Sequence, residues 1–413
     1  MFRLLVFAGA MLWSDAALAA PDVLSPDSFA ALLDLRASAA GGEPSWLNGG
    51  FGKTDIDGGG GRLDGHARIE EADLAWKPQL AWNLSAVIEA ELQPEHENGV
   101  HLGEAFLIYK PTPHSETRYQ VRVGLFYPPI SLENGGPFWT TTSTITPSAI
   151  NSWVGEEVKV VGAEASVRRA FGDQELGLTG GVFGFDDNAG ELIALRGWSL
   201  DNVRESVGGG FRLPPVSDFL EYVQSQHEAP LTEFDGHVGG YARLDWRVSD
   251  RLALNAFAYD NNAKPTAVYD GQWGWRTRFV EVGARLDPDE QTEVLGQALF
   301  GQTQMGPGDP GRWVNTDFSA AYLLVSRRLG DADALTGRLD LFETRDSTDA
   351  YYGLTQEHGW AVTADYLRPL SKHATLLVEA LHIWSDRPAR EDNAADAPTQ
   401  AQTVVQTALR LSF

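Results

Sequence analysis

Apolar and polar residues alternate along most of this chain, in segments of roughly ten to fourteen residues. The C-terminal segment shows the pattern over its whole length. One parity holds Ala401, Thr403, Val405, Thr407, Leu409, Leu411 and Phe413, and the other holds Gln402, Gln406, Arg410 and Ser412. Because successive side chains of a strand point to opposite faces, the pattern predicts a strand with one face for lipid and one for water.

A segment near residue 240 has the same arrangement with more charge. Leu244 and Trp246 share the apolar parity, whereas Arg243, Asp245 and Arg247 share the other. Three charges on one face do not fit an ordinary packed core unless each of them is paired. Segments 31–38, 119–125 and 163–168 alternate in the same way. A soluble β-sandwich also alternates, so the number and regularity of the segments favour a barrel rather than parity alone.

Short turn signals separate these segments into pairs. They lie at Lys77 to Leu80, Pro111 to Glu116, Phe171 to Gln174, Ser249 to Arg251, Asp287 to Gln291, Gly330 to Asp333 and Pro369 to His373. With one strand before the first turn and one after the last, the turns predict sixteen strands, an even number as in single-chain bacterial barrels. The predicted fold class is therefore all-β: an antiparallel transmembrane β-barrel of about sixteen strands, with short periplasmic turns and long extracellular loops.

Two predicted connections are much longer than the others. The first spans residues 127–157 and is rich in aromatic residues and poor in charge, so we expect it to pack inside the molecule. Its candidates for a constriction are Tyr127, Pro128, Glu133, Phe138, Trp139 and Trp153. The second spans residues 187–236, with a short amphipathic helix predicted near 217–225. Connections of this length in a compact protein are functional or disordered.

The N-terminus has the features of a secretory signal peptide. Arg3 precedes an apolar stretch, and Ala17-Leu18-Ala19 fits the small-x-small cleavage rule. We expect residues 1–19 to be a signal peptide and residues 20–413 to form one outer-membrane barrel. A barrel closes on its backbone hydrogen bonds and needs no disulfides, which agrees with the absence of cysteine. The net charge of −25 excludes a general nucleic-acid binder.

No motif in the sequence indicates catalysis or a bound cofactor. There is no Gly-x-Ser-x-Gly elbow, no His-Glu-x-x-His and no phosphate loop, and the nine histidines are scattered. The acidic stretches Asp55-Ile56-Asp57-Gly58 and Asp186-Asp187-Asn188 with Glu191 do not complete a calcium-loop pattern. We therefore expect no enzyme activity, no cofactor and no dedicated metal site; adventitious calcium at such loops stays open.

Aromatic residues gather near the predicted strand ends and on the outward parity. They are Trp76, Trp82, Tyr109, Trp246, Trp360, Tyr366 and Trp384. Amphipathic rings favour the membrane interface, so these residues predict aromatic girdles. The aromatic residues of the first long connection could instead form a stacking track for a sugar, an alternative that the sequence leaves open.

The stretch Val123-Gly124-Leu125-Phe126-Tyr127-Pro128-Pro129-Ile130-Ser131-Leu132-Glu133 resembles the phosphate-selective porin family of Gram-negative outer-membrane channels. Thr146-Pro147-Ser148-Ala149-Ile150 and Trp153-Val154-Gly155-Glu156-Glu157 extend the likeness. The resemblance implies a sixteen-stranded pore of the porin superfamily, a homotrimer, whose third extracellular loop folds inward and narrows the lumen. The family's arginine ladder and lysine cluster have no counterpart in this sequence, so its anion selectivity does not carry over.

The inward parity of the predicted strands carries both signs of charge. The pore-lining candidates are Arg36, Glu104, Arg122, Glu164, Arg168, Arg243, Asp245, Arg247, Arg285 and Arg410. Further inward acids are expected at Asp34, Glu71, Asp73, Glu89, Glu91, Glu281, Asp340, Asp365 and Glu379, against Lys110 and Arg338. Because rings of one sign set the ion preference of a pore, this mixture with a slight acidic excess predicts weak cation preference or none.

The sequence therefore predicts an outer-membrane porin for passive diffusion of small hydrophilic solutes or ions, in a Gram-negative bacterium. The alternatives are a channel specific for a phosphate-like anion, a sugar or an organic acid, and a closed barrel that acts as an enzyme or adhesin. The expected partners are the solutes, outer-membrane lipid and lipopolysaccharide, and the barrel assembly machinery, which we expect to recognise the terminal Phe413.

Overall fold

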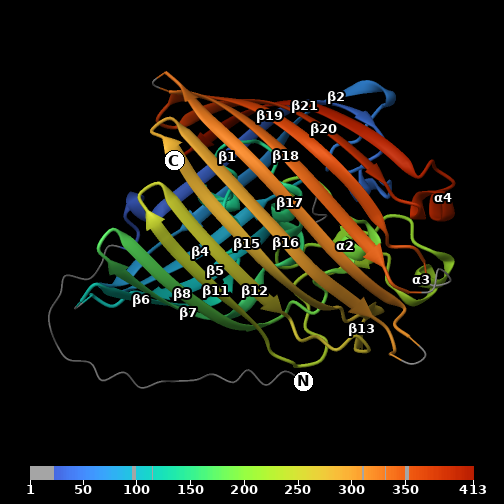
Figure 1. The fold of residues 1–413 in the computed structure, drawn as a ribbon, viewed down its shortest axis with the longest axis horizontal. Coiled ribbons are helices and arrows are strands. Elements are labelled where there is room, and N and C mark those ends of the chain that lie inside the picture. Colours follow the sequence, from blue (N-terminus) through green and yellow to red (C-terminus); the bar gives the residue numbers. More distant parts are fainter. Residues whose placement is uncertain (1–22, 95–98, 114, 309–310, 331, 349–352) are drawn as a thin grey trace.

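The protein is a closed antiparallel β-barrel (Figure 1). A computed structural model describes residues 23–413 except 95–98, 114, 309–310, 331 and 349–352, so the predicted signal peptide lies outside the described residues. The barrel strands are β1 (Phe29–Gly42), β2 (Gly60–Trp76), β4 (Leu84–Leu92), β5 (Val100–Tyr109), β6 (Thr117–Phe126), β7 (Val160–Phe171), β8 (Gln174–Gly184), β11 (Gly239–Ser249), β12 (Leu252–Asp260), β15 (Arg276–Asp289), β16 (Thr292–Met305), β17 (Val314–Leu329), β18 (Asp333–Asp346), β19 (Glu357–Ser371), β20 (Ala374–Asp386) and β21 (Thr399–Ser412).

Each of these strands pairs with its neighbours along the chain, and the last returns to the first. β21 pairs with β1 from Leu32 opposite Ser412 to Gly41 opposite Thr403. The closure leaves no open sheet edge, which a lipid-exposed sheet cannot have. The predicted barrel of sixteen strands is confirmed.

Connections at the two ends of the barrel differ in length. At one end they cover residues 77–83, 110–116, 172–173, 250–251, 290–291, 330–332 and 372–373, the places of the predicted turns; β3 (Gln79–Ala81) lies in the first and pairs with β4. At the other end they cover residues 43–59, 93–99, 127–159, 185–238, 261–275, 306–313, 347–356 and 387–398. We call these the turn end and the loop end of the barrel.

The strands present an apolar outer face. In β17, Phe318, Tyr322 and Leu324 point inward and are almost wholly buried, whereas Leu323 and Val325 point outward and are 54% and 40% exposed. The same alternation leaves outward Val, Leu and Phe side chains exposed on many other strands. Such a continuous apolar belt does not suit water, and it is the surface that a lipid-embedded barrel requires. No helix in the described part of the chain is long and apolar enough to span a bilayer.

Exposed aromatic side chains mark one border of this belt. Trp82, Tyr109, Tyr119, Phe171 and Trp246 lie in or next to the connections of the turn end, and each is at least 40% exposed. Rings that are apolar but carry a polar edge favour the membrane interface. Their position places a lipid boundary near the turn end.

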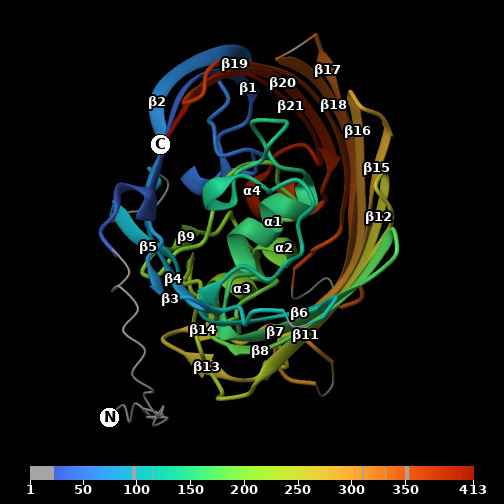
Figure 2. The same cartoon turned by 90° about the vertical axis from the view of Figure 1, so that its left-hand side faces the viewer.

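Two long connections fold back into the barrel instead of extending from it. Residues 127–159 contain α1 (Ala149–Glu157), and residues 185–238 contain α2 (Glu191–Leu195) and α3 (Asp218–Val223). Figure 2 shows α1 and α2 inside the ring of strands. α3 and α4 (Ala389–Ala394) lie at the loop end (Figure 1). The connections there also contain two short antiparallel strand pairs, β9 (Phe211–Arg212) with β10 (His227–Glu228) and β13 (Val268–Tyr269) with β14 (Gln272–Trp273). The helix predicted near 217–225 is α3.

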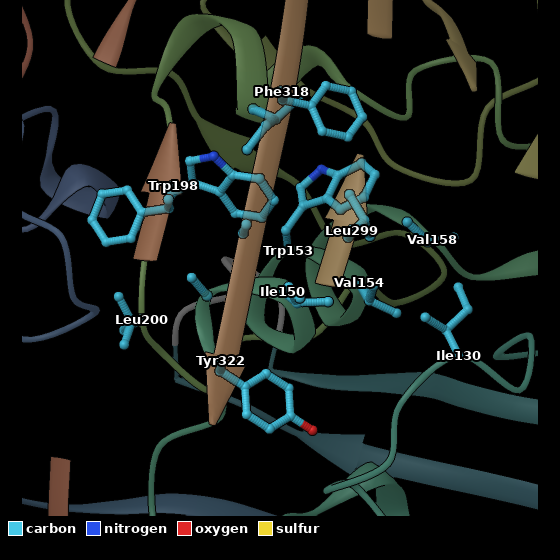
Figure 3. Packing of buried hydrophobic residues seen from close by; sticks show 14 of the residues in the cluster. Ile130, Ile150, Trp153, Val154, Val158, Trp198, Leu200, Leu299, Phe318 and Tyr322 are labelled. Carbon is cyan, nitrogen blue, oxygen red and sulfur yellow. The ribbon is translucent and has the colours of Figure 1, made fainter. Parts of the chain in front are cut away.

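An apolar core joins the inward-folded connections to one half of the barrel wall. Trp153 of α1 is fully buried and meets Phe279 of β15 and Phe318 of β17 edge-on, at centroid distances of 5.3 and 5.1 Å. Trp198 of the second connection packs against the same Phe318 (Figure 3). Phe183, Tyr241, Phe257 and Tyr259 continue this core along the wall. Burial of large aromatic surface anchors the two connections on the side of β8 to β19.

Candidate functional site: a charged seam inside the barrel

The opposite half of the wall, formed by β21, β1, β2, β4 and β5, meets the folded connections through charged groups. Its inward acids Glu71 and Asp73 on β2, Glu89 and Glu91 on β4 and Glu104 on β5 form what we call the acidic wall. Asp73 and Glu91 are direct cross-strand partners. Like charges opposite each other repel, so this part of the wall requires cations from elsewhere.

Arg204, from the connection 185–238, supplies one of these cations. Its Nη2 atom lies 2.6 Å from Oε1 of Glu71, 3.1 Å from Oδ2 of Asp73 and 3.4 Å from Oε2 of Glu91. Nη1 donates to the carbonyl of Phe138 in the other folded connection. The pKa of Arg204 is raised because these carboxylates outweigh the effect of burial. One side chain therefore joins both connections to the acidic wall.

Lys159, at the end of the connection 127–159, is the second cation beside the acidic wall. Its Nζ atom lies 3.9 Å from Oε1 of Glu91 and 4.5 Å from the ring centroid of Tyr127. It also donates to the carbonyl of Glu205. Two cations thus face the acidic wall. We call the boundary between the wall strands β21, β1, β2, β4 and β5 and the folded connections the seam.

The neighbouring stretch of the seam, on β1 and β21, holds paired charges of both signs. Asp34 accepts from Arg36 and from Arg410, each at 3.0 Å. Arg36 also donates to Asn202 at 2.7 Å, and Arg410 donates to the carbonyl of Thr141 at 2.9 Å. These contacts are polar and directional. Two small apolar clusters lie beside them, one of Phe138 with Leu32 and Ala75 and one of Ile145 with Leu377 and Ala408.

Arg338 of β18 fixes the connection 127–159 at a further point. It is fully buried and donates to the carbonyls of Thr146 and Pro147 at 2.7 and 2.8 Å, and to Asp340 at 2.8 Å. Glu133 lies 3.4 Å from it and accepts from the backbone of Ser148 at 2.7 Å. The start of α1 is therefore held by hydrogen bonds to charged groups, which are stronger than neutral ones.

The two folded connections are also tied to each other. Arg196 makes two hydrogen bonds to Glu156 of α1, at 2.5 and 2.6 Å, and its guanidinium lies 4.3 Å from the ring centroid of Trp46. Burial raises the pKa of Glu156, and Arg196 opposes that shift. A buried pair of this kind is costly to break from one side, so the connections form one body inside the barrel.

The seam contains little free space. A cavity of about 10 Å³ lies between the wall and the connections, lined by Glu71, Arg410, Asn202, Arg204 and Trp139 among others. That volume is about one water molecule. Cavities of about 1020 and 800 Å³ lie among the connections of the loop end, and one of about 550 Å³ lies at the turn end. Within the part of the chain that the structure describes, the cavity found between the wall and the connections is thus narrow, and wider cavities lie at both ends of the barrel.

The mouth at the loop end is acidic. Asp218, Glu221 and Asp392 line the cavity of about 1020 Å³ with no described Lys or Arg among its lining residues, whereas the neighbouring cavity of about 800 Å³ is lined by Arg212 as well as Glu221. In a narrow entrance, charges of one sign raise the local concentration of the opposite ion. This mouth would collect cations.

The predicted pore-lining residues all lie on the inner wall or at its turn end, and each has a polar partner. Arg122 pairs with Glu164 at 2.9 Å, Arg243 with Asp245 at 2.8 Å, and Arg285 with Glu293 at 2.9 Å. Longer contacts join Arg168 to Asp245 and Arg247 to Glu175, at 3.9 and 3.8 Å. Glu104 accepts from the backbone of Tyr127 at 2.9 Å. These residues reinforce the wall in this conformation, and the mixed signs leave no basic ladder.

The predicted constriction residues lie inside the barrel. Tyr127 and Trp139 stack at 4.2 Å between centroids, and the Tyr127 hydroxyl donates to the carbonyl of Gly155 at 2.9 Å. Pro128, Glu133 and Phe138 are buried, and Trp153 lies in the apolar core. Because the ring of Trp153 is fully covered, the four aromatic residues do not form a continuous exposed track.

Sequence reasoning missed the cations that cross the seam. Arg204 and Lys159 lie in or next to loop segments without periodicity, so parity could not place them. The only signal was a cation within a long connection of a strongly acidic chain. It also missed Glu70, which a β-bulge in β2 turns inward beside Glu71.

The acids of the two stretches noted in the sequence bond to different partners in the structure. Asp55 pairs with Arg68 at 2.6 Å. Asp186 bonds to the Tyr259 hydroxyl and Asn188 to Glu228, so the run is dispersed. Within the described residues, the group whose acids converge is Asp187, Glu233 and Asp235, with ligand atoms within 4.8 Å of one another. The backbone of Phe234 donates to Asp187 at 2.7 Å, and burial raises the pKa of Asp187 to about 7.

Comparison with known proteins adds evidence on the fold. No family model matches the sequence, and no curated protein matches it. Among solved structures, the chain is similar to the outer membrane channel DcaP of Acinetobacter baumannii, with a TM-score of 0.56, 11% identity, and coverage of 93% of this chain and 96% of that one. An anion-selective porin from Comamonas acidovorans aligns with a TM-score of 0.55, 13% identity, and coverage of 93% and 98%.

A loop-deletion mutant of OmpT, an outer membrane protein of Vibrio cholerae, aligns with a TM-score of 0.53, 8% identity, and coverage of 94% of this chain and all of that one. At these identities the likeness shows a shared barrel fold. The sixteen-stranded antiparallel barrel that the resemblance in the sequence implies is confirmed, whereas the likeness to the phosphate-selective porin family stays a prediction.

Proposed function

We propose that this protein is an outer-membrane channel for passive diffusion of small hydrophilic solutes or ions, closed at its middle in the conformation described. The observation that carries the proposal is the charged seam between two wide mouths, inside a barrel whose outer face is apolar. Ionised groups inside a lipid-embedded barrel mark the path of polar solutes.

The route follows the acidic wall. On the side of β8 to β19 an apolar core holds the connections, and separating that surface exposes aromatic rings to water. On the side of β21 to β5 the apolar clusters are small, and most contacts are ion pairs and hydrogen bonds, whose groups water can solvate on both sides once the path opens. A passage therefore opens first along the seam.

The orientation and partners follow the usual arrangement of such barrels. We infer that the turn end faces the periplasm and the loop end the cell exterior, where acidic loops meet lipopolysaccharide. We infer export by a signal peptide over residues 1–19 and recognition of Phe413 by the assembly machinery. The side chain of Phe413 is 68% exposed at the turn end. A homotrimer is an expectation from the family resemblance.

Selectivity for phosphate finds no support in the seam. Each described arginine that faces it has an acidic partner, and Glu71, Asp73 and Glu91 gather around one guanidinium. The acidic mouth at the loop end adds to this balance. We therefore propose a preference for cations over anions.

Planar-bilayer recording tests the channel function. Purified protein in a potassium chloride gradient should give single-channel openings whose reversal potential has the sign of potassium preference. A reversal potential of chloride sign would overturn the cation preference and favour an anion channel. Complete absence of openings would overturn the channel and favour a closed barrel with an enzymatic or adhesive role.

A further inference from the structure

Three carboxylates surround a single nitrogen atom on the channel wall. Nη2 of Arg204 is within 3.4 Å of Glu71, Asp73 and Glu91, and all three acids are at least nine-tenths buried. A guanidinium terminal nitrogen carries two hydrogens, whereas a primary ammonium carries three. Three acceptors around one nitrogen therefore match the donors of an ammonium group better than those of the arginine that occupies the site.

The hydrogen-bond inventory shows the mismatch. Asp73 accepts from Nη2 through Oδ2, but its other buried oxygen, Oδ1, and the buried Oε1 of Glu91 have no hydrogen-bond partner among the described residues. Buried carboxylate oxygens are normally satisfied, and each unsatisfied one is costly. The pocket thus keeps acceptor capacity that Arg204 does not use.

The charge balance of the pocket points the same way. Glu71, Asp73 and Glu91 stand against Arg204, with Lys159 3.9 Å from Glu91. Glu89 and Glu104 lie on the same wall. If Arg204 left the site with its connection, a cluster of carboxylates would face the opened path and would attract a mobile cation.

We propose that Glu71, Asp73 and Glu91 form a binding site for primary ammonium solutes in the open channel, and that Arg204 occupies this site as a tethered competitor in the closed one. The inference rests on the proposed channel function and names the class of solute. It also assigns the closing contact, because Arg204 bonds to Phe138 and so releases both connections when it leaves.

Chemical complementation of Arg204→Ala tests the binding site without any current measurement. Thermal unfolding of the detergent-solubilised variant should shift upward with methylammonium chloride and not with tetramethylammonium chloride, which has the same charge and no N–H donors. Adding Glu71→Gln and Asp73→Asn should weaken the methylammonium effect about tenfold or more, since a hydrogen bond to a charged group is worth about 1.5–3 kcal/mol. Arg204→Gln serves as the milder variant if Arg204→Ala does not fold.

Equal shifts with the two cations, or a methylammonium shift that survives loss of the carboxylates, would overturn the site. Arg204→Lys is the matched control, because its own ammonium should fill the site and leave added methylammonium without effect. Bilayer recording of Arg204→Ala separates the two proposals. No current together with specific methylammonium stabilisation would retain the site and reject the channel, whereas current without such stabilisation would do the reverse.

Discussion

Single residues determine how the folded connections respond to pH. Asp187 begins the turn that packs against Glu233 and Asp235, and burial raises its pKa to about 7. For a carboxyl whose folded pKa lies above its unfolded value, the stabilisation is complete below the unfolded pKa and disappears as pH rises through the folded one. The connection 185–238 should therefore loosen progressively as the pH rises from about 4 to about 7.

Asp187→Asn should remove this pH dependence. The amide oxygen can still accept from the backbone of Phe234, and no charge develops beside Glu233 and Asp235. Hydrogen exchange of residues 185–238, corrected for intrinsic rates, should become faster at pH 7 than at pH 5 in the wild type and stay constant in the variant. Equal pH dependence in both proteins would contradict the role of Asp187.

At the scale of elements, α1 is anchored by one large side chain. Trp153 is fully buried between Phe279, Phe318 and Trp198. Trp153→Ala should destabilise the packing of the connection by about 3–5 kcal/mol, the usual cost of emptying such a site. The measurement is hydrogen exchange of α1, which should lose protection, and bilayer recording, which should show more frequent openings. Trp246→Ala, on the outer face, is the control and should change neither.

The strands of the barrel could be predicted from the sequence, but one irregularity in them could not. Strand alternation and turn residues specify the sixteen strands, because both are local properties of the chain. The bulge in β2, in contrast, is visible only in the pairing of β2 with β1. Asp34 pairs with Glu71 but Leu35 with Ile69, so Glu70 is the extra residue and Ile69 turns outward, where it is 49% exposed. Parity counted from Glu71 assigns Ile69 inward, and only the pairing with β1 reveals the change.

The contacts of the two folded connections were even harder to predict from the sequence. Their aromatic content predicts packing, but the partner of each side chain depends on where the chain returns inside the barrel. Arg204 and Glu71 are 133 residues apart in sequence, and nothing local links them. The carboxylates of the site could therefore be assigned to the inner wall, whereas the cation that fills it could not be identified.

At the scale of the whole molecule, the barrel has an apolar outer face and a charged inner face. A single charge placed on the outer face tests whether that face contacts lipid. Leu339 lies near the middle of β18 and is 45% exposed on the apolar belt, whereas its neighbours Arg338 and Asp340 are buried inside. Leu339→Arg should lower the stability of the barrel in lipid vesicles by about 2–4 kcal/mol, the cost of arginine at the bilayer midplane. Urea titration of folding into vesicles measures the change.

Tyr222→Arg is the control, at the loop end where the ring is 90% exposed. It should have little effect because the added charge stays in water. Equal stabilities of the two variants would mean that the belt does not contact lipid, and the outer-membrane location would then have to be abandoned together with the channel.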